Sequence, residues 1–216
     1  MKYGVLGTGM VGHTLATKLA DLGHEVRMGA RKKNNQKAIQ WANAVGGSAG
    51  HGTFSSVAQW ADRIIIAIKG AEIESLSETL QDKDVSGKPV IDVTNPLDFS
   101  GGMPPVLVPS LSNTTSAGEV LQAMFPSAYV VKALNTLNHE VMVDPGRVPG
   151  THDVFLCGDH ERAKQDVISM LAEFGWHSPI DLGPLAAARG TEGLMPFWLR
   201  MYSVHGNADF NYAIKR

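Results

Sequence analysis

The stretch "KYGVLGTGMVGHTLATKLADLGHEVRMGARKKNN", residues 2–35, decides the fold. An apolar run leads into glycines at positions 7, 9 and 12, then into a helix-like segment and a second apolar run. The pattern G-x-G-x-x-G between a strand and a helix is typical of folds that hold a dinucleotide diphosphate on free N–H groups at a helix N-terminus. We therefore expect a dinucleotide to contact Gly7, Thr8, Gly9, Met10, Val11 and Gly12.

The rest of the chain alternates short runs rich in Val and Ile with helix-like segments, which predicts an α/β fold with a doubly wound, mostly parallel Rossmann-like sheet. Predicted strands are residues 3–6, 25–28, 64–68, 90–93, 129–133, 154–157 and 179–182. Predicted helices are residues 11–22, 36–44, 55–60, 72–80, 117–124 and 161–174, the last capped by Asp159. We divide the chain into a Rossmann domain, 1–183, and a small C-terminal helical cap or subunit interface, 184–216.

Composition excludes several classes of function. The chain has 216 residues, a formal net charge of -2 and one short basic run at residues 31–33, so we expect no nucleic-acid partner. The first predicted strand begins next to Met1, and no apolar run reaches the roughly 18 residues of a membrane helix. We expect a cytoplasmic protein with no membrane partner. The histidines lack metal-ligand spacing, so we expect no metal, and the single cysteine, Cys157, is expected to be buried.

The second predicted strand ends in "MGARKK", residues 28–33, where NAD sites usually carry an acidic residue that binds the ribose 2'-OH. Arg31 can instead form a bidentate pair with a 2'-phosphate, for which Ala30 leaves space. Such a charge-assisted contact is worth about 1.5 to 3 kcal/mol, hence roughly ten- to over a hundredfold preference for NADP over NAD. Lys32 is a second phosphate candidate, and Lys33 is expected in solvent. Alternatively, all three form an ordinary solvated run.

Three further segments end at the carboxyl edge of the predicted sheet, where open α/β folds bind ligands: "AIKG" at 67–70, "VTNPL" at 93–97 and "KALNT" at 132–136. Asn95 is expected to bind the nicotinamide carboxamide, although an ordinary Asn-Pro turn is the alternative. Lys69 fits a phosphate contact and plain exposure equally well. Asn135 and Thr136 are the next candidates for contacting the nicotinamide or the acceptor, and capping of a following helix is their alternative. The cofactor contacts expected from these segments are Ile68, Lys69, Asn95, Pro96, Leu97 and Asn135.

No nucleophile or acid–base pair stands out, so the catalytic residues are unknown, with Asn135 and His139 as weak candidates. Hydride transfer between stacked rings depends mainly on positioning and exclusion of water. Lone histidines are more often structural. Lys132, within a predicted strand, is interpreted as an edge or ion-paired lysine, with an active-site cation as the alternative. The long loop 98–116 and residues 189–197 are expected to form the acceptor pocket. Trp198 and Tyr202, four residues apart, are attributed to helix packing or a dimer interface.

Five segments carry a family resemblance: residues 4–31, "IDVTNPL" at 91–97, "VVKALNT" at 130–136, "DVFLCGD" at 153–159 and "DLGPLAAAR" at 181–189. With them, nearly the whole chain resembles the NADPH-dependent reductases of the deazaflavin coenzyme F420. Its core is also similar to the cytoplasmic domain of the six-transmembrane epithelial antigen of prostate metalloreductases, which passes electrons from NADPH to flavin. The resemblance implies that Thr8 and Arg31 hold the 2'-phosphate. Ala30 departs from the serine common there, and "GTGMVG" is closer to the metalloreductase form.

These observations predict an NADP(H)-dependent oxidoreductase whose acceptor is coenzyme F420 or a flavin, FMN or FAD. One alternative is reduction of a small carbonyl or imine metabolite, which the short segment after Gly183 disfavours, because such enzymes usually carry a long helical domain. The other is a non-catalytic NADPH-sensing module, since a fold alone does not fix a function. We expect a small-molecule redox acceptor and a homodimer as partners.

Overall fold

The order of strands in the sheet follows the doubly wound pattern predicted from the sequence. In the computed structural model, which describes residues 1–215, the main sheet has the order β10-β9-β8-β5-β4-β1-β2-β3. Its strands are β1 (Lys2–Leu6), β2 (Glu25–Ala30), β3 (Gly50–Thr53), β4 (Arg63–Ile66), β5 (Pro89–Asp92), β8 (Tyr129–Ala133), β9 (Phe155–Gly158) and β10 (Ile180–Asp181). All neighbours are parallel except β8 and β9, which pair antiparallel.

Helices cover both faces of this sheet. They are α1 (Met10–Asp21), α2 (Gln36–Val45), α3 (Phe54–Trp60), α4 (Asp82–Val85), α5 (Ala117–Met124), α6 (His139–Val143), α7 (Glu161–Phe174), α8 (Ala188–Gly193) and α9 (Met195–His205). Residues 1–215 also contain four 3-10 helices: η1 (Gly70–Glu78), η2 (Pro109–Leu111), η3 (Pro145–Arg147) and η4 (Leu185–Ala187). A small hairpin of β6 (Leu97–Asp98) and β7 (Val106–Leu107) lies outside the main sheet.

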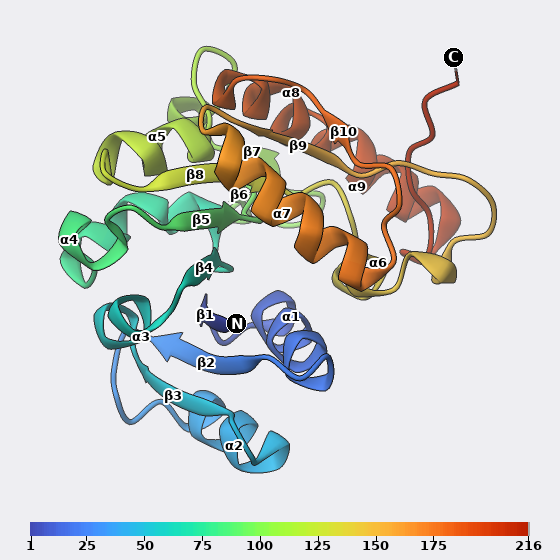
Figure 1. The fold of residues 1–216 in the computed structure, drawn as a ribbon. Coiled ribbons are helices and arrows are strands. Elements are labelled where there is room, and N and C mark those ends of the chain that lie inside the picture. The colour runs from blue at the N-terminus through green and yellow to red at the C-terminus, as the bar shows by residue number, and fades with distance from the viewer. Residues whose placement is uncertain (216) are drawn as a thin grey trace.

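The hydrophobic core consists of one large cluster on each face of the sheet. The first buries α1, α2, α6 and α7 through residues such as Leu15, Trp41 and Val167. The second buries α3, η1 and α5 through residues such as Val57, Leu76 and Leu121. Figure 1 shows the resulting three layers, with α3, α4 and α5 on one side of the sheet and α1, α6 and α7 on the other. The strands between them are buried on both faces, as a parallel sheet requires.

Several helix boundaries follow from local capping. Asn35 caps α2 by accepting a hydrogen bond from the Ala38 N–H at 3.1 Å. Helix α7 ends at Gly175, which adopts a left-handed conformation. The prediction that Asp159 caps α7 is wrong. The cap is His160, whose Nδ1 accepts from the Ala163 N–H at 3.3 Å, whereas the Asp159 carboxylate accepts from the Leu185 N–H at 2.9 Å.

Two segments differ from the prediction in kind. Strand β3 was not predicted, because its sequence "GHGT" has no apolar alternation; it forms by adding to the edge of β2. Residues 72–80 were predicted as an α-helix, but the chain forms the 3-10 helix η1 there. The hydroxyls of Ser75 and Ser77 donate to carbonyls three residues earlier, at 2.7 and 2.8 Å, which competes with α-helical bonding. Helices α4 and α6 were also missing from the predicted set.

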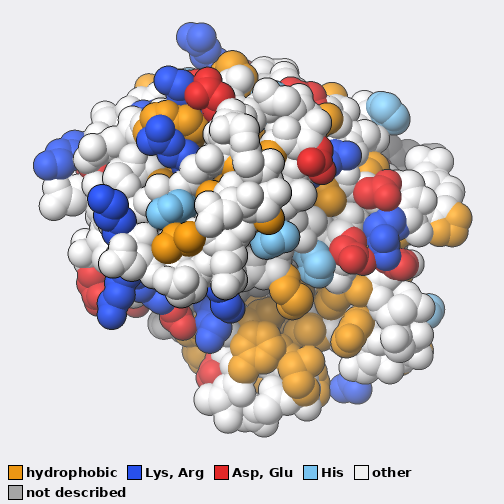
Figure 2. All heavy atoms as spheres, turned by 90° about the horizontal axis from the view of Figure 1, so that it is seen from below, with side chains coloured by type: hydrophobic (Ala, Val, Ile, Leu, Met, Phe, Trp, Pro, Cys, Tyr) orange, Lys and Arg blue, Asp and Glu red, His pale blue; other side chains and the backbone are white. Residues whose placement is uncertain are grey.

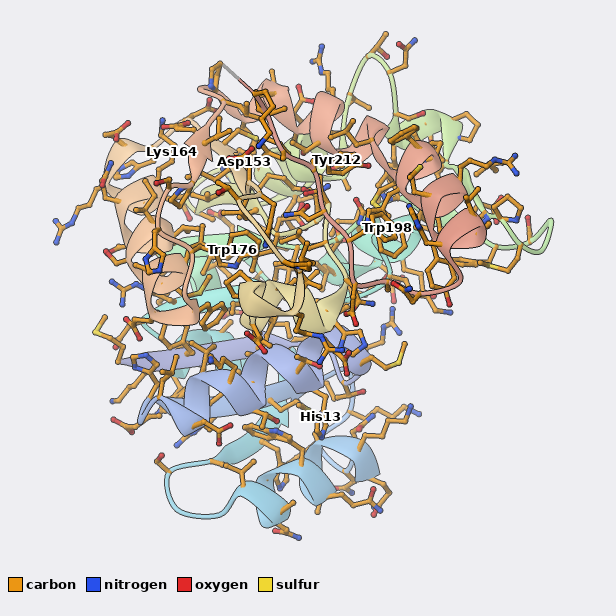
Figure 3. All side chains as sticks on the ribbon, turned by 90° about the vertical axis from the view of Figure 1, so that its right-hand side faces the viewer. His13, Asp153, Lys164, Trp176, Trp198 and Tyr212 are labelled. Carbon is orange, nitrogen blue, oxygen red and sulfur yellow. The ribbon has the colours of Figure 1, made fainter. Side chains whose placement is uncertain are left out.

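The C-terminal portion is helical over η4, α8 and α9, from Leu185 to His205, whereas residues 206–215, which were also expected to be helical, form no helix. Met195, Trp198 and Leu199 of α9 form a third cluster with Leu97 and Leu107 of the hairpin. Trp198 stacks on Tyr202 with ring centroids 5.7 Å apart, in agreement with the helix-packing interpretation. Beyond α9 the chain returns to the start of β9. Figure 3 shows Asp153 and Tyr212 close together there, and the Asp153 N–H donates to the Tyr212 carbonyl at 2.9 Å.

The surface carries both kinds of charge. On the face in Figure 2, acidic and basic side chains are interspersed, and hydrophobic side chains gather in one hollowed area toward its lower edge. Within residues 1–215, no helix combines the length and the apolar character needed to cross a membrane.

Candidate cofactor site

A cleft of about 790 Å³ opens at the carboxyl ends of β1, β2 and β4 and at the N-terminus of α1. It brings together nine residues that the sequence predicted for the cofactor: Gly7, Thr8, Gly9, Met10, Val11, Arg31, Lys32, Ile68 and Lys69. Gly12 does not line the cleft but lies next to its lining residues, in the first turn of α1. Asn95, Pro96, Leu97 and Asn135 lie beyond the lining of the cleft, at the ends of β5 and β8.

The three glycines of the motif differ in the space around them. Gly7 has a φ of +138°, and a Cβ atom there would collide with the Ala67 carbonyl. A Cβ at Gly12 would collide with the Gly7 carbonyl, so Gly12 allows α1 to approach β1 closely. At Gly9 a Cβ would meet no atom within 4 Å, because it would point into the cleft. The space beside Gly9 is where a diphosphate would lie.

The N-terminus of α1 adds electrostatic support for an anion at this position. Gly9 caps the helix without a side-chain hydrogen bond, and its carbonyl accepts from the His13 N–H at 2.9 Å. The first N–H groups of α1 therefore face the cleft at the positive end of the helix dipole. Gly9, the open space and α1 together fit the diphosphate of a dinucleotide.

Arg31 lies at the end of β2 and meets a carboxylate across the cleft. Its Nη2 donates to Glu72 Oε2 at 2.6 Å and to Ser75 Oγ at 3.2 Å. Lys69 Nζ lies 3.7 Å from Glu72 Oε1. The hydrogen bond from Arg31 holds the pKa of the Glu72 carboxyl below its usual value, so Glu72 is ionised at neutral pH. The predicted phosphate ligand, Arg31, is thus already paired with an acid from a distant segment of the chain.

Asn95 and Asn135 form a reciprocal amide pair between the ends of β5 and β8. Asn95 Nδ2 donates to the Asn135 carbonyl at 2.7 Å, and Asn135 Nδ2 donates to Asn95 Oδ1 at 2.9 Å. The preceding residue, Leu134, is buried and has a φ of +63°, an uncommon conformation for a bulky residue. Each asparagine thereby fixes the other. The Asn95 carbonyl also accepts from the Leu97 N–H at 2.9 Å, so the local turn expected as the alternative is present as well. The cap of α6 is Asn138 and not Asn135.

His139 begins α6 and packs against α1. Its Nδ1 lies 2.9 Å from Thr14 Oγ1, in a half-buried contact between the two helices. This hydrogen bond gives the imidazole a structural partner. Asn138 caps α6, since its side chain accepts a hydrogen bond from the Glu140 N–H at 2.9 Å.

A buried ion cluster supports the carboxyl edge of the sheet. Lys132 Nζ lies 2.9 Å from Asp92 Oδ2, 2.6 Å from Glu192 Oε1 and 2.6 Å from the Thr94 carbonyl. Glu192, on α8, also accepts from the N–H groups of Ala117 and Gly118 at the start of α5. Lys132 is therefore ion-paired as expected, but it is not at an edge, because β8 is an interior strand.

The pKa values in this cluster reflect burial and an excess of negative charge. Burial opposes the ammonium form of Lys132, but Asp92 and Glu192 overcome it and raise its pKa. Burial raises the pKa of Glu192, and the nearby Asp92 raises it further. The cluster joins β5, β8 and the C-terminal portion beside the segment that carries Asn95.

Several residues of the cleft were missed from the sequence. Besides Glu72, they include Asn34, Asn35, Gln36 and Phe54. Residues 34–36 directly follow the basic run, so their proximity to Arg31 could have drawn attention to them. Glu72 and Phe54 come from other parts of the chain, and no local spacing identifies them.

Comparisons with known proteins identify the family of this chain. The sequence model of the family described as "NADP oxidoreductase coenzyme F420-dependent" matches residues 2–96. The F420-dependent NADP reductase of Methanocaldococcus jannaschii is 28% identical over 206 residues, which cover 91% of this chain and 90% of that protein. The metalloreductase STEAP3 of Rattus norvegicus is 30% identical over 201 residues; the match covers 91% of this chain but spans only 38% of STEAP3.

A solved structure is similar over the full length. It is a protein of Arthrobacter sp. FB24, provisionally assigned as an F420-dependent NADP reductase, and it is 42% identical with a TM-score of 0.92. The match covers 100% of both chains, so the resemblance includes the hairpin and the C-terminal helices as well as the cofactor cleft.

Proposed function

Since this chain belongs to the family of coenzyme F420-dependent NADP oxidoreductases, we propose that it transfers a hydride between NADP(H) and the deazaflavin ring of coenzyme F420. The family makes it an NADP-dependent oxidoreductase. One observation carries the proposal: a single cleft contains both Arg31 and Gly9, and the space beside Gly9 is free of protein atoms. The choice of a deazaflavin is supported by the end-to-end similarity to two proteins described as F420-dependent NADP reductases.

The residues of the cleft fit the phosphates of NADP(H). The N–H groups at the start of α1 would receive the diphosphate beside Gly9, and Thr8 lines the same cleft. Arg31 and Lys32 would receive the 2'-phosphate at the end of β2. When bound, NADPH supplies a hydride from C4 of its nicotinamide, and the solvent or a side chain supplies the proton that completes the two-electron reduction of the acceptor.

We assign the nicotinamide end to the Asn95–Asn135 pair and to Pro96 and Leu97, which follow it at the carboxyl edge of β5. The reciprocal hydrogen bonds hold both amides in fixed orientation, which favours positioning over acid–base chemistry. Pro96 is buried and would exclude water on one side. His139, bonded to Thr14, is assigned no proton transfer in this proposal.

The acceptor can be identified by isotope transfer. Purified protein is mixed with NADPH carrying deuterium at both C4 positions, and with coenzyme F420, FMN, a small carbonyl or imine, or no acceptor. Loss of the reduced nicotinamide absorbance reports turnover, and mass spectrometry of the product reports the label. Deuterium delivered to a deazaflavin forms a C–D bond that does not exchange with water, whereas deuterium delivered to flavin N5 is lost.

The proposal predicts turnover with F420 and retention of deuterium in the reduced product. Turnover with FMN alone would move the assignment to a flavin reductase, which the similarity to part of STEAP3 makes the second candidate. Turnover only with the carbonyl or imine would contradict a ring acceptor. Tight NADPH binding without turnover in any arm would instead identify a sensing module.

A further inference from the structure

The Arg31–Glu72 ion pair crosses the proposed 2'-phosphate site. Arg31 follows β2, and Glu72 lies in the first turn of η1 after β4; both strands are neighbours of β1. Both side chains line the same cleft, together with Lys69. One carboxylate therefore contacts two cationic side chains, Arg31 at 2.6 Å and Lys69 at 3.7 Å.

The position of the carboxylate resembles that of an anionic ligand. Arg31 uses Nη2 for both Glu72 and Ser75. A bidentate contact to a phosphate requires two N–H groups along one edge of the guanidinium, and both such edges, Nε–Nη2 and Nη1–Nη2, include Nη2. A bidentate phosphate therefore competes with Glu72 and Ser75 for the N–H groups of Nη2. If the phosphate instead made a single contact through Nη1 or Nε, the phosphate and the Glu72 carboxylate would both lie beside one cation and repel each other.

We infer that Glu72 is a specificity-determining residue that competes with the 2'-phosphate for Arg31, and so limits the preference for NADP over NAD. The inference rests on the proposed use of NADP(H). It assigns to Glu72 the opposite role from the acidic residue of NAD sites, which contacts the ribose and is usually found at the end of β2. Here the acid approaches the same site from η1 and acts through Arg31.

The exposure of the pair sets the size of the effect. The Arg31 and Glu72 side chains are 50% and 41% exposed, so their attraction is screened by water and salt. Breaking an exposed pair of this kind changes an equilibrium by about two- to fivefold. Glu72→Lys replaces the carboxylate with a cation, which gives the 2'-phosphate a second partner. A charge-assisted contact of this kind lowers the dissociation constant by about tenfold or more.

The test measures the dissociation constants of NADPH and NADH by titration calorimetry on the full chain. The variants are Glu72→Gln, which removes the charge, and Glu72→Lys, which reverses it. Glu74→Gln is the matched control, because Glu74 is an exposed glutamate on the same 3-10 helix that does not line the cleft. Each titration is repeated at low and at high salt.

We expect Glu72→Gln to bind NADPH about two- to fivefold more tightly and Glu72→Lys about tenfold more tightly, with NADH changed less than about twofold. Glu74→Gln should match the parent, and the gain should shrink at high salt. Weaker NADPH binding in Glu72→Gln would overturn the inference, because it would mean that Glu72 positions Arg31. Equal gains for NADPH and NADH would also overturn it. A parent chain that binds neither nucleotide would refute the proposed function itself.

Discussion

Replacing Lys132 with Met should destabilise the fold strongly, because Lys132 is the cation of a buried ion cluster. Its side chain is 1% exposed, and those of its partners Asp92 and Glu192 are 0% and 3% exposed. Met has a similar length but carries no charge, so Lys132→Met leaves two buried carboxylates without a counter-ion. Removing one partner from a buried ion pair typically costs about 3 to 5 kcal/mol. That loss is a large part of the roughly 5 to 15 kcal/mol of a typical domain.

The matched control is Lys164→Met. Lys164 also contacts two carboxylates, Asp181 at 2.7 Å and Glu161 at 3.1 Å, but these are 35% and 69% exposed. Water can solvate both carboxylates after the substitution, so we expect a loss of about 1 kcal/mol or less. Urea denaturation without cofactor, followed by circular dichroism, measures both variants. A Lys132→Met loss no larger than that of Lys164→Met would refute the assignment of a desolvated cluster.

The cluster also predicts how the loss depends on pH. Burial raises the pKa of Glu192 in the fold, so protonation of Glu192 stabilises the folded state at low pH, and this contribution is lost as pH rises through the folded pKa. Lys132 holds that pKa down, and its removal moves the window to higher pH. Lys132→Met should therefore regain stability as pH falls from neutral toward about 4 to 5, where carboxyls ordinarily titrate. A loss that stays constant over this range would contradict the reasoning.

Further predictions concern four residues: Gly9, Gly12, Arg31 and Cys157. Gly9→Ala should change the free energy of unfolding by no more than about 1 kcal/mol but abolish NADPH binding. Gly12→Ala should lower the free energy of unfolding by about 1 to 3 kcal/mol, because its Cβ would collide with the Gly7 carbonyl. Denaturation measures the effect on stability, and nucleotide titration measures the effect on binding. Arg31→Gln should weaken NADPH binding about ten- to a hundredfold and leave NADH nearly unchanged, and equal thermal shifts by both nucleotides in the parent would oppose this assignment. Burial raises the pKa of the Cys157 thiol to about 12, so iodoacetamide should label Cys157 only after unfolding; labelling of the native protein would contradict its burial.

Local patterns in the sequence predicted most of the fold. Strand β8 and helices α5 and α7 have the predicted bounds, because apolar periodicity and clear boundary residues coincide there. The glycine motif and Arg31 meet in one cleft as predicted, since each occupies a fixed place in a βαβ unit. Strand β3 could not be predicted from its sequence, because pairing with the edge of β2 determines its conformation and its own side chains do not.

The unpredicted parts of the site depend on contacts between distant segments. Glu72 lies 41 residues from Arg31, so their pairing becomes visible only when β2 and β4 are known to flank β1. Asp92 and Lys132 are direct register partners on β5 and β8, and a charged residue within each apolar run was a signal that could have suggested a pair. Glu192 reaches them from α8, and nothing in its own segment indicates a buried partner.

The two margins of the main sheet have a consequence for self-association. One margin is β3, four residues with two glycines, and the other is β10, which is two residues long. Short edge strands expose few backbone N–H and C=O groups with which a second chain could pair, and few apolar side chains against which it could pack. This protects an open sheet against fibril-like growth. The edges of the sheet therefore do not favour a continuous sheet formed from two copies of this chain.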